Sequence, residues 1–276
     1  MNKDIINKKG WENIWKKVEK NRLEDEKIIQ QELVTYRWKE IESRIIKRFG
    51  SFRNIKTIEV GSGRGEISLI FNLRGAKTTL LDYVQGALDN AALLFKHFGC
   101  HAQFICADAF NLPPWMLESF DVSMSFGTVE HYDYPQRQKI FNIHAALLRP
   151  GGLSFISVPN KLSLPYHIWR IMLEINHEWV VGKEIPFTIW ELKKLAFRAG
   201  YNTCEVVSCS SFFRDNKLLL KEIKRIISQH FPLVVRAYKR IKGRKETKGR
   251  PFSIEKERPS IFDRYFSGCL MLVASK

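Results

Sequence analysis

The stretch that decides the fold is KTIEVGSGRGEISLIFNLRG, Lys56–Gly75. It begins with a short run rich in β-branched side chains, continues with three glycines at alternate positions, and ends with apolar residues at helical spacing. A loop between a buried strand and a helix needs glycine where the backbone turns sharply and where a ligand lies against the main chain. The stretch therefore predicts a strand, a nucleotide-binding loop and a helix.

Short β-branched runs alternate with helical patterns through the centre of the chain. This rhythm is typical of a parallel sheet with helices on both faces. The runs are KTIEV, TTLLDYV, AQFICAD, FDVSMSF and LSFISVPN, followed further on by YNTCEVVSCS and SGCLMLVAS. We therefore expect an α/β fold with a doubly wound, mostly parallel, seven-stranded, Rossmann-like sheet.

The sequence on either side of these runs predicts an N-terminal helical layer and one domain with two additions. Apolar residues at spacings of three to five in residues 1–50 predict a helical N-terminal layer. Residues 51–276 are expected to form one domain with two additions. The first is an aromatic segment at 161–187, and the second is a basic helical insertion at 211–266, before the last strand.

The positive charge of the chain is concentrated in one segment. The net charge is +16, and residues 217–250 hold twelve lysines and arginines against two glutamates, a net charge of +10. A localised basic segment points to an anionic partner or surface more strongly than a uniformly basic protein does.

Composition also bears on compartment and metal content. The start of the chain is charged and lacks a secretory leader pattern, and no run of about 18 uncharged apolar residues occurs. We expect a cytoplasmic protein. The five cysteines have no paired, zinc-like spacing, so free thiols and no metal site are expected.

The glycine loop departs from the patterns of phosphate-binding loops. The dinucleotide pattern G-x-G-x-x-G would require glycine where Glu66 stands, and no G-K-[ST] follows. Glu59, in the strand before the loop, would repel a phosphate and attract a cation. A cationic ligand without phosphates, such as S-adenosylmethionine, fits better.

Two aspartates follow the next two predicted strands. Asp82 lies 21 positions beyond Gly61, where a carboxylate can accept hydrogen bonds from both ribose hydroxyls. Asp108 can accept one from an adenine amino group. Either residue alone can equally be a helix cap or a turn residue. Together, at one edge of a parallel sheet and in register with the loop, they favour a nucleoside site.

Residues 55–160 resemble the class I S-adenosylmethionine-dependent methyltransferases, in particular the subgroup of quinone and other small-molecule methyltransferases. The resemblance rests on IEVGSGRGEIS, LLDYVQGALDNA, ADAFNLP, FDVSMSFGTVEHY and LLRPGGLSFISVPN. It implies S-adenosylmethionine as cofactor, S-adenosylhomocysteine as product, and methyl transfer as the reaction. The cofactor contacts that it implies, together with Glu59, are Gly61, Ser62, Gly63, Asp82, Tyr83, Asp108, Ala109, Phe126 and Gly127.

A base is needed only where the methyl acceptor must lose a proton. His131, in the EHY sequence after the fourth predicted strand, has a suitable unperturbed pKa of about 6.5. It is our candidate base, with a structural hydrogen bond or, with Glu130, a turn cap as the alternative.

Motifs that the sequence lacks limit the class of methyl acceptor. FGTVEHY stands where enzymes that methylate amino groups of nucleic acids carry N/D-P-P-Y/F, and no cysteine is placed for pyrimidine C5 chemistry. A small or amphipathic, lipid-like acceptor is the better hypothesis. Tyr132, Tyr166 and Trp169 are candidate acceptor contacts, although the 161–187 segment can equally be a lid packed on the core.

The basic insertion leaves several roles open. Apolar residues at helical spacing with lysine and arginine between them predict an amphipathic pair of helices, with Pro232 as a break. Such helices can cap the acceptor site or bind an anionic membrane at the inner membrane face. RNA contact is less favoured because aromatic residues are few. An RNA methyltransferase and a non-catalytic binding module remain the alternatives to a small-molecule enzyme.

Overall fold

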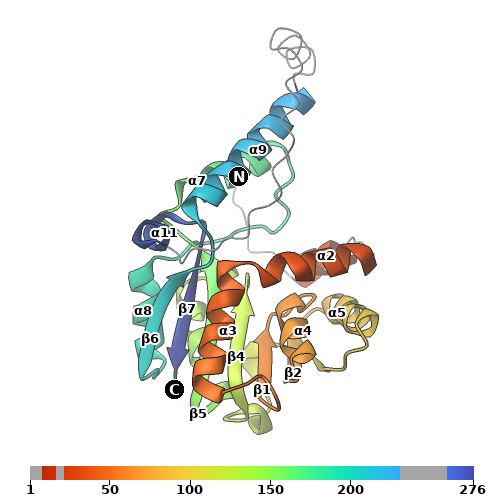
Figure 1. The fold of residues 1–276 in the computed structure, drawn as a ribbon, viewed down its shortest axis with the longest axis vertical. Coiled ribbons are helices and arrows are strands. Elements are labelled where there is room, and N and C mark those ends of the chain that lie inside the picture. Colours follow the sequence, from red (N-terminus) through yellow and green to blue (C-terminus); the bar gives the residue numbers. More distant parts are fainter. Residues whose placement is uncertain (1–7, 17–21, 231–259) are drawn as a thin grey trace.

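The computed structural model of the 276-residue chain describes residues 8–16, 22–230 and 260–276. Its centre is a seven-stranded sheet in the order β3-β2-β1-β4-β5-β7-β6 (Figure 1). The strands are β1 Lys56–Val60, β2 Lys77–Asp82, β3 Gln103–Cys106, β4 Phe120–Phe126, β5 Leu148–Pro159, β6 Thr203–Ser208 and β7 Cys269–Ser275. The five neighbouring strands β3, β2, β1, β4 and β5 pair in parallel, and β7 is antiparallel to both β5 and β6. The predicted α/β, mostly parallel, seven-stranded sheet is confirmed.

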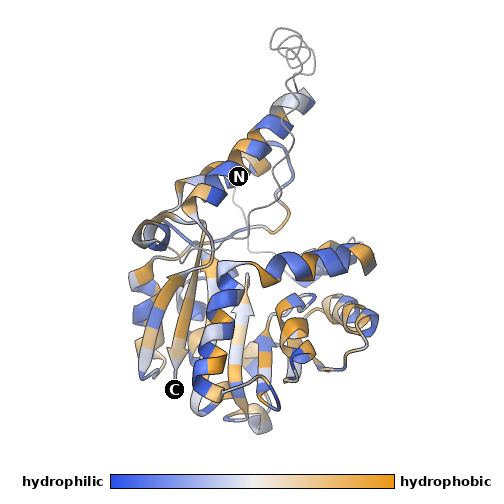
Figure 2. Ribbon diagram, in the orientation of Figure 1, coloured by the Kyte–Doolittle hydropathy of each residue, from blue (hydrophilic) through white to orange (hydrophobic). Residues whose placement is uncertain are grey.

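Helices cover both faces of the sheet and bury two apolar layers. One layer packs α3, α4 and α5 against the sheet, and the other packs α6 and α8 against the opposite face. The bounds are α3 Tyr36–Phe49, α4 Glu66–Leu73, α5 Gln85–His97, α6 Tyr134–Leu147 and α8 Ile189–Arg198. Figure 2 shows the hydrophobic strands enclosed between these layers.

Three helices precede the glycine loop in the described part of the chain. They are α1 Lys8–Lys16, α2 Arg22–Leu33 and α3. Helix α3 begins at a Thr35 cap, whose hydroxyl accepts from the backbone N–H of Trp38 at 3.0 Å. It ends at Gly50, whose φ of 76° suits glycine. Because Trp38, Ile41 and Ile45 are buried on one face, α3 is part of the core.

The segments that the sequence treats as additions are partly helical. They contain α7 Leu164–Ile175, α9 Phe212–His230 and α11 Ile261–Phe266. Asp263 caps α11 and also accepts from the backbone N–H of Phe212 at 2.8 Å, so one carboxylate fixes the starts of two helices. The predicted second basic helix, after Pro232, lies outside the described residues.

One boundary differs from the sequence expectation. The run LSFISVPN predicts a strand from Leu153, whereas α6 ends at Leu147 and β5 already begins at Leu148. Pro150 cannot continue a helix because it lacks the N–H donor, and Gly151 follows at a φ of 80°. The chain therefore enters β5 earlier than expected.

Candidate active site

A cavity of about 680 Å³ opens at the carboxyl ends of β1, β2 and β4. Along the sheet, strand order reverses between β1 and β4, and such a reversal opens a crevice in parallel sheets. All ten residues predicted to contact the cofactor line this cavity, as do His131 and Tyr132. Tyr166 and Trp169 are not among its lining residues.

The glycine loop has the backbone that its sequence predicts. Gly61, Gly63 and Gly65 all have positive φ, from 53° to 69°. The N–H of Gly61 donates to the Leu81 carbonyl at 2.8 Å, which ties the loop to β2. A Cβ at Gly61 would lie 2.4 Å from the side chain of Thr128, so packing as well as φ requires glycine there.

Asp82 connects the loop to the end of β2. Its carboxylate accepts from the backbone N–H of Gly63 at 3.0 Å and from that of Val84 at 2.9 Å. Burial raises its pKa, and these two N–H donors oppose the shift. Asp108 caps the short helix η1 Ala109–Asn111 and accepts from Phe110 N–H at 3.0 Å. Its cap role is therefore real, and it still lines the cavity.

Burial changes the charge that the sequence suggests for Glu59. Glu59 is buried, accepts from the Ser68 hydroxyl at 2.5 Å, and burial raises its pKa to about 8. At neutral pH its carboxyl is mostly protonated in the free protein. A cation beside it would favour the ionised form, so its attraction for a cation is coupled to proton release.

The start of helix α4 is closed to phosphate by an acidic side chain. Glu66 is the first residue of α4, at the helix end where phosphates usually bind. Burial raises the pKa of Glu66 as well. The side chain of Glu66 thus stands at the helix end that a phosphate would need.

Arg37 is a cavity residue that the sequence analysis missed. It lies in the first turn of α3, and its guanidinium donates to both carboxylate oxygens of Glu32, at 2.9 and 2.6 Å. It also lies 5.3 Å from the ring centroid of Phe126. No motif marks this arginine, because α3 precedes the glycine loop and reaches the cavity only through tertiary packing.

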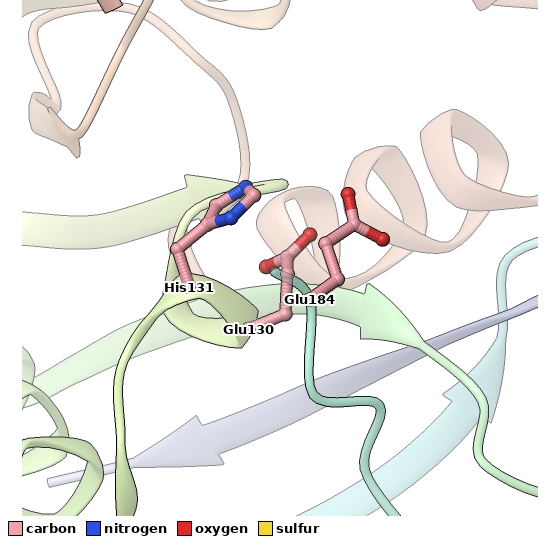
Figure 3. A group of neighbouring side chains, drawn as sticks. All are labelled: Glu130, His131 and Glu184. Atoms are coloured by element: carbon pink, nitrogen blue, oxygen red, sulfur yellow. The ribbon is translucent and has the colours of Figure 1, made fainter. Parts of the chain in front are cut away.

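A second group of polar residues lies across the cavity from β2. Glu130 and His131 belong to the short helix η3 Val129–His131, and Glu184 comes from the segment after α7 (Figure 3). One oxygen of each glutamate and one ring nitrogen of His131 lie within 4.8 Å of one another. Glu130 is 2 % exposed, and its Oε2 has no hydrogen-bond partner among the described residues.

The backbone brings Glu184 to this place. The N–H of Ile185 donates to the Glu130 carbonyl at 2.9 Å, and Nδ1 of His131 lies 3.2 Å from the Lys183 carbonyl oxygen. Buried Arg137 donates to the Ile185 carbonyl as well. Sequence reasoning missed Glu184 because 53 residues separate it from His131.

The electrostatics of this group favour neutral forms. Burial, and then the nearby Glu184, raise the pKa of Glu130 well above its usual range, and burial lowers the pKa of His131. Neutral His131 with its proton on Nδ1 leaves Nε2 able to accept a proton. Two carboxyls and an imidazole at this spacing can share a proton or hold a divalent cation.

The three candidate acceptor residues are placed differently. Tyr132 lines the cavity. Tyr166 is buried behind the wall, where its hydroxyl donates to Glu184 Oε2 at 2.7 Å. Trp169 packs against Trp179, with ring centroids 5.7 Å apart. The aromatic segment therefore acts here by supporting Glu184.

The chain is similar to known methyltransferases. Residues 58–152 match a family model described as a methyltransferase domain. A ubiquinone biosynthesis O-methyltransferase from Chromobacterium violaceum is 28% identical over 137 residues. Residues 58–152 are therefore a methyltransferase domain, and they are similar to the class I, S-adenosylmethionine-dependent enzymes. That match covers 50% of this chain, and the chain spans only about half of the relative's length, 56%.

Solved structures share the fold of the methyltransferase domain. A 1,6-didemethyltoxoflavin-N1-methyltransferase from Burkholderia thailandensis superimposes with a TM-score of 0.51 at 16% identity, covering 85% of this chain and 76% of its own. The [4+2]-cyclase SpnF gives 0.53 at 17% identity, covering 86% and 80%. Because one neighbour is described as a cyclase, the shared fold leaves the reaction open.

The first prediction concerns Glu59. Its folded-state pKa is raised, so native protein holds a proton that the unfolded chain releases between about pH 4.5 and 8. Stability should therefore fall as the pH rises through this window. Glu59→Gln removes the contribution of this residue and should gain about 4 kcal/mol of unfolding free energy over the wild type between pH 5 and 9. Urea denaturation without ligand measures it, and parallel pH profiles would contradict it.

Proposed function

We propose that this protein transfers the methyl group of S-adenosylmethionine to a hydroxyl oxygen of a small, amphipathic acceptor. The observation that carries the proposal is the pairing of two groups across one cavity. The glycine loop and Asp82 stand on one side, and Glu130, His131 and Glu184 stand on the other. An oxygen acceptor is supported by the similarity to relatives that are named ubiquinone biosynthesis O-methyltransferases.

The cavity suits the chemical groups of the cofactor. Asp82 can accept from the ribose hydroxyls, and Asp108 with Ala109 can receive the adenine. Arg37 offers a cation to the methionine carboxylate, and Glu59 offers a carboxylate to the ammonium group. When bound, the cofactor supplies an electrophilic methyl group on sulfur.

The residues across the cavity then act on the acceptor. Nε2 of neutral His131 accepts the hydroxyl proton as the oxygen attacks the methyl group. The imidazolium that forms favours the ionised forms of Glu130 and Glu184, and their carboxylates then stabilise it. Much of the rate enhancement comes from holding the two reactants in line.

The test of this proposal is transfer of radiolabelled methyl groups. Purified protein is incubated with labelled S-adenosylmethionine and a set of hydroxylated aromatic and lipid-like acceptors, and the organic extract is counted. We expect labelled product, and His131→Asn should lower turnover by about 10²-fold or more, because the base is lost. His101→Asn, at an exposed site, is the matched control.

Three results would contradict the assignment. Unchanged turnover in His131→Asn, with label still transferred, would remove the base role. Label transferred to RNA and to none of the small acceptors would favour the alternative RNA methyltransferase. A protein that binds cofactor but transfers no label to any acceptor would favour the non-catalytic module.

We also propose that helix α9 attaches the protein to anionic membranes. Phe213, Lys217, Leu220 and Lys224 recur at spacings of three and four, so they share one face, and all are exposed. Phe213 is 75 % exposed. Figure 2 shows hydrophobic and hydrophilic residues alternating along α9. Within the described ranges, no helix is long and apolar enough to cross a membrane. A face of this kind binds in the plane of the lipid surface.

Vesicle co-sedimentation tests the membrane proposal. The protein should pellet with phosphatidylglycerol vesicles and stay in solution with phosphatidylcholine vesicles. The double variant Phe213→Ser/Leu220→Ser should lose about tenfold or more in vesicle affinity, since two exposed apolar contacts are removed. Leu73→Ser, exposed on α4, is the control. Equal binding by the double variant and the wild type would exclude α9 as the attachment site.

A further inference from the structure

Helix α1 lies over the cavity and contributes two tryptophans to its lining, Trp11 and Trp15. We propose that α1 is a cover of the cofactor site, with Trp15 as a wall against the bound cofactor and Trp11 as a positioning residue for His131. This inference rests on the proposed function. Neither tryptophan belongs to the region that matches the methyltransferase domain, residues 58–152.

The contact of Trp15 places it at the glycine loop. A Cβ built on Gly63 would lie 2.7 Å from Cη2 of Trp15, so the indole edge occupies the space beside this glycine. Gly63 is also the residue whose N–H donates to Asp82. The indole ring is therefore held at the loop and carboxylate that form the cofactor subsite.

The contact of Trp11 places it at the acceptor side. Its ring centroid lies 5.0 Å from that of His131, with the two planes at 82°. Because Trp11 and Trp15 are four residues apart on one helix, they face the cavity together and cover its two halves. An edge-to-face contact limits the rotation of the imidazole ring, which the Lys183 carbonyl fixes from the other side.

Besides these ring contacts, α1 packs against α5. The helix has nine residues, and none of them is fully buried. A helix of this length is marginal in water without tertiary contacts. Its carboxyl end is fixed by Asn90, whose side-chain amide donates to the Trp15 carbonyl at 2.9 Å. A ligand under the two rings adds apolar contact, so cofactor binding should stabilise the docked helix.

Calorimetric titration with S-adenosylhomocysteine tests whether Trp15 contacts the bound cofactor. Trp15→Ala should weaken binding about tenfold, the usual scale of one aromatic contact with a ligand. Trp15→Phe should recover most of the affinity, because it keeps an aromatic ring on the same backbone position. Trp190→Ala is the matched control, since Trp190 is 65 % exposed on α8 and does not line the cavity.

Hydrogen exchange of the full chain gives a second readout. Saturating S-adenosylhomocysteine should slow exchange of the amides of residues 8–16, and Trp15→Ala should abolish this protection. If the wild type binds S-adenosylhomocysteine while Trp15→Ala binds equally well and residues 8–16 show no protection, the inference about α1 is wrong and the proposed function stands. If the wild type binds no S-adenosylhomocysteine, the proposed function fails, and the inference fails with it.

Discussion

The site depends on one constraint of the sheet, the reversal of strand order between β1 and β4. Parallel strands deliver their carboxyl ends to one edge, and the reversal sends the following chain to opposite sides, which leaves a crevice. The loops after β1 and β4 meet across this crevice, where the Thr128 hydroxyl donates to the Gly61 carbonyl at 3.0 Å. Glu59, Glu130 and His131 lie on the strand and the short helix that flank this junction.

Several carboxyl groups are buried around the cavity, and few basic side chains line it. Glu59, Asp82, Glu130 and Glu184 line it, and burial raises the pKa of each. Keeping a buried carboxyl ionised is costly, and Glu59, whose pKa is raised to about 8, is mostly protonated at neutral pH in the free protein. A ligand with a sulfonium and an ammonium group supplies the missing positive charge. Cofactor binding and proton release are therefore coupled in this account.

Much of the fold and the cofactor side could be predicted from the sequence. The alternation of strand and helix patterns fixes the parallel sheet, and the positions of Asp82 and Gly63 relative to the strands place them together, because that relation is local. Arg37, Trp15 and Glu184 could not be found in this way. Each reaches the cavity from a distant part of the chain by tertiary packing, and no spacing rule connects it to the glycine loop. The protonation of Glu59 likewise depends on its burial.

The most direct test of the central claim is a calorimetric titration with S-adenosylmethionine, at pH 7, in two buffers with different ionisation enthalpies. We expect one cofactor bound per chain. The binding enthalpy should differ between the buffers, because Glu59 releases its proton when the ammonium group of the cofactor binds. In Asp82→Ala the affinity should fall tenfold or more, as charged hydrogen bonds are lost. Absence of binding at millimolar cofactor, or binding that is unaffected by Asp82→Ala, would contradict it.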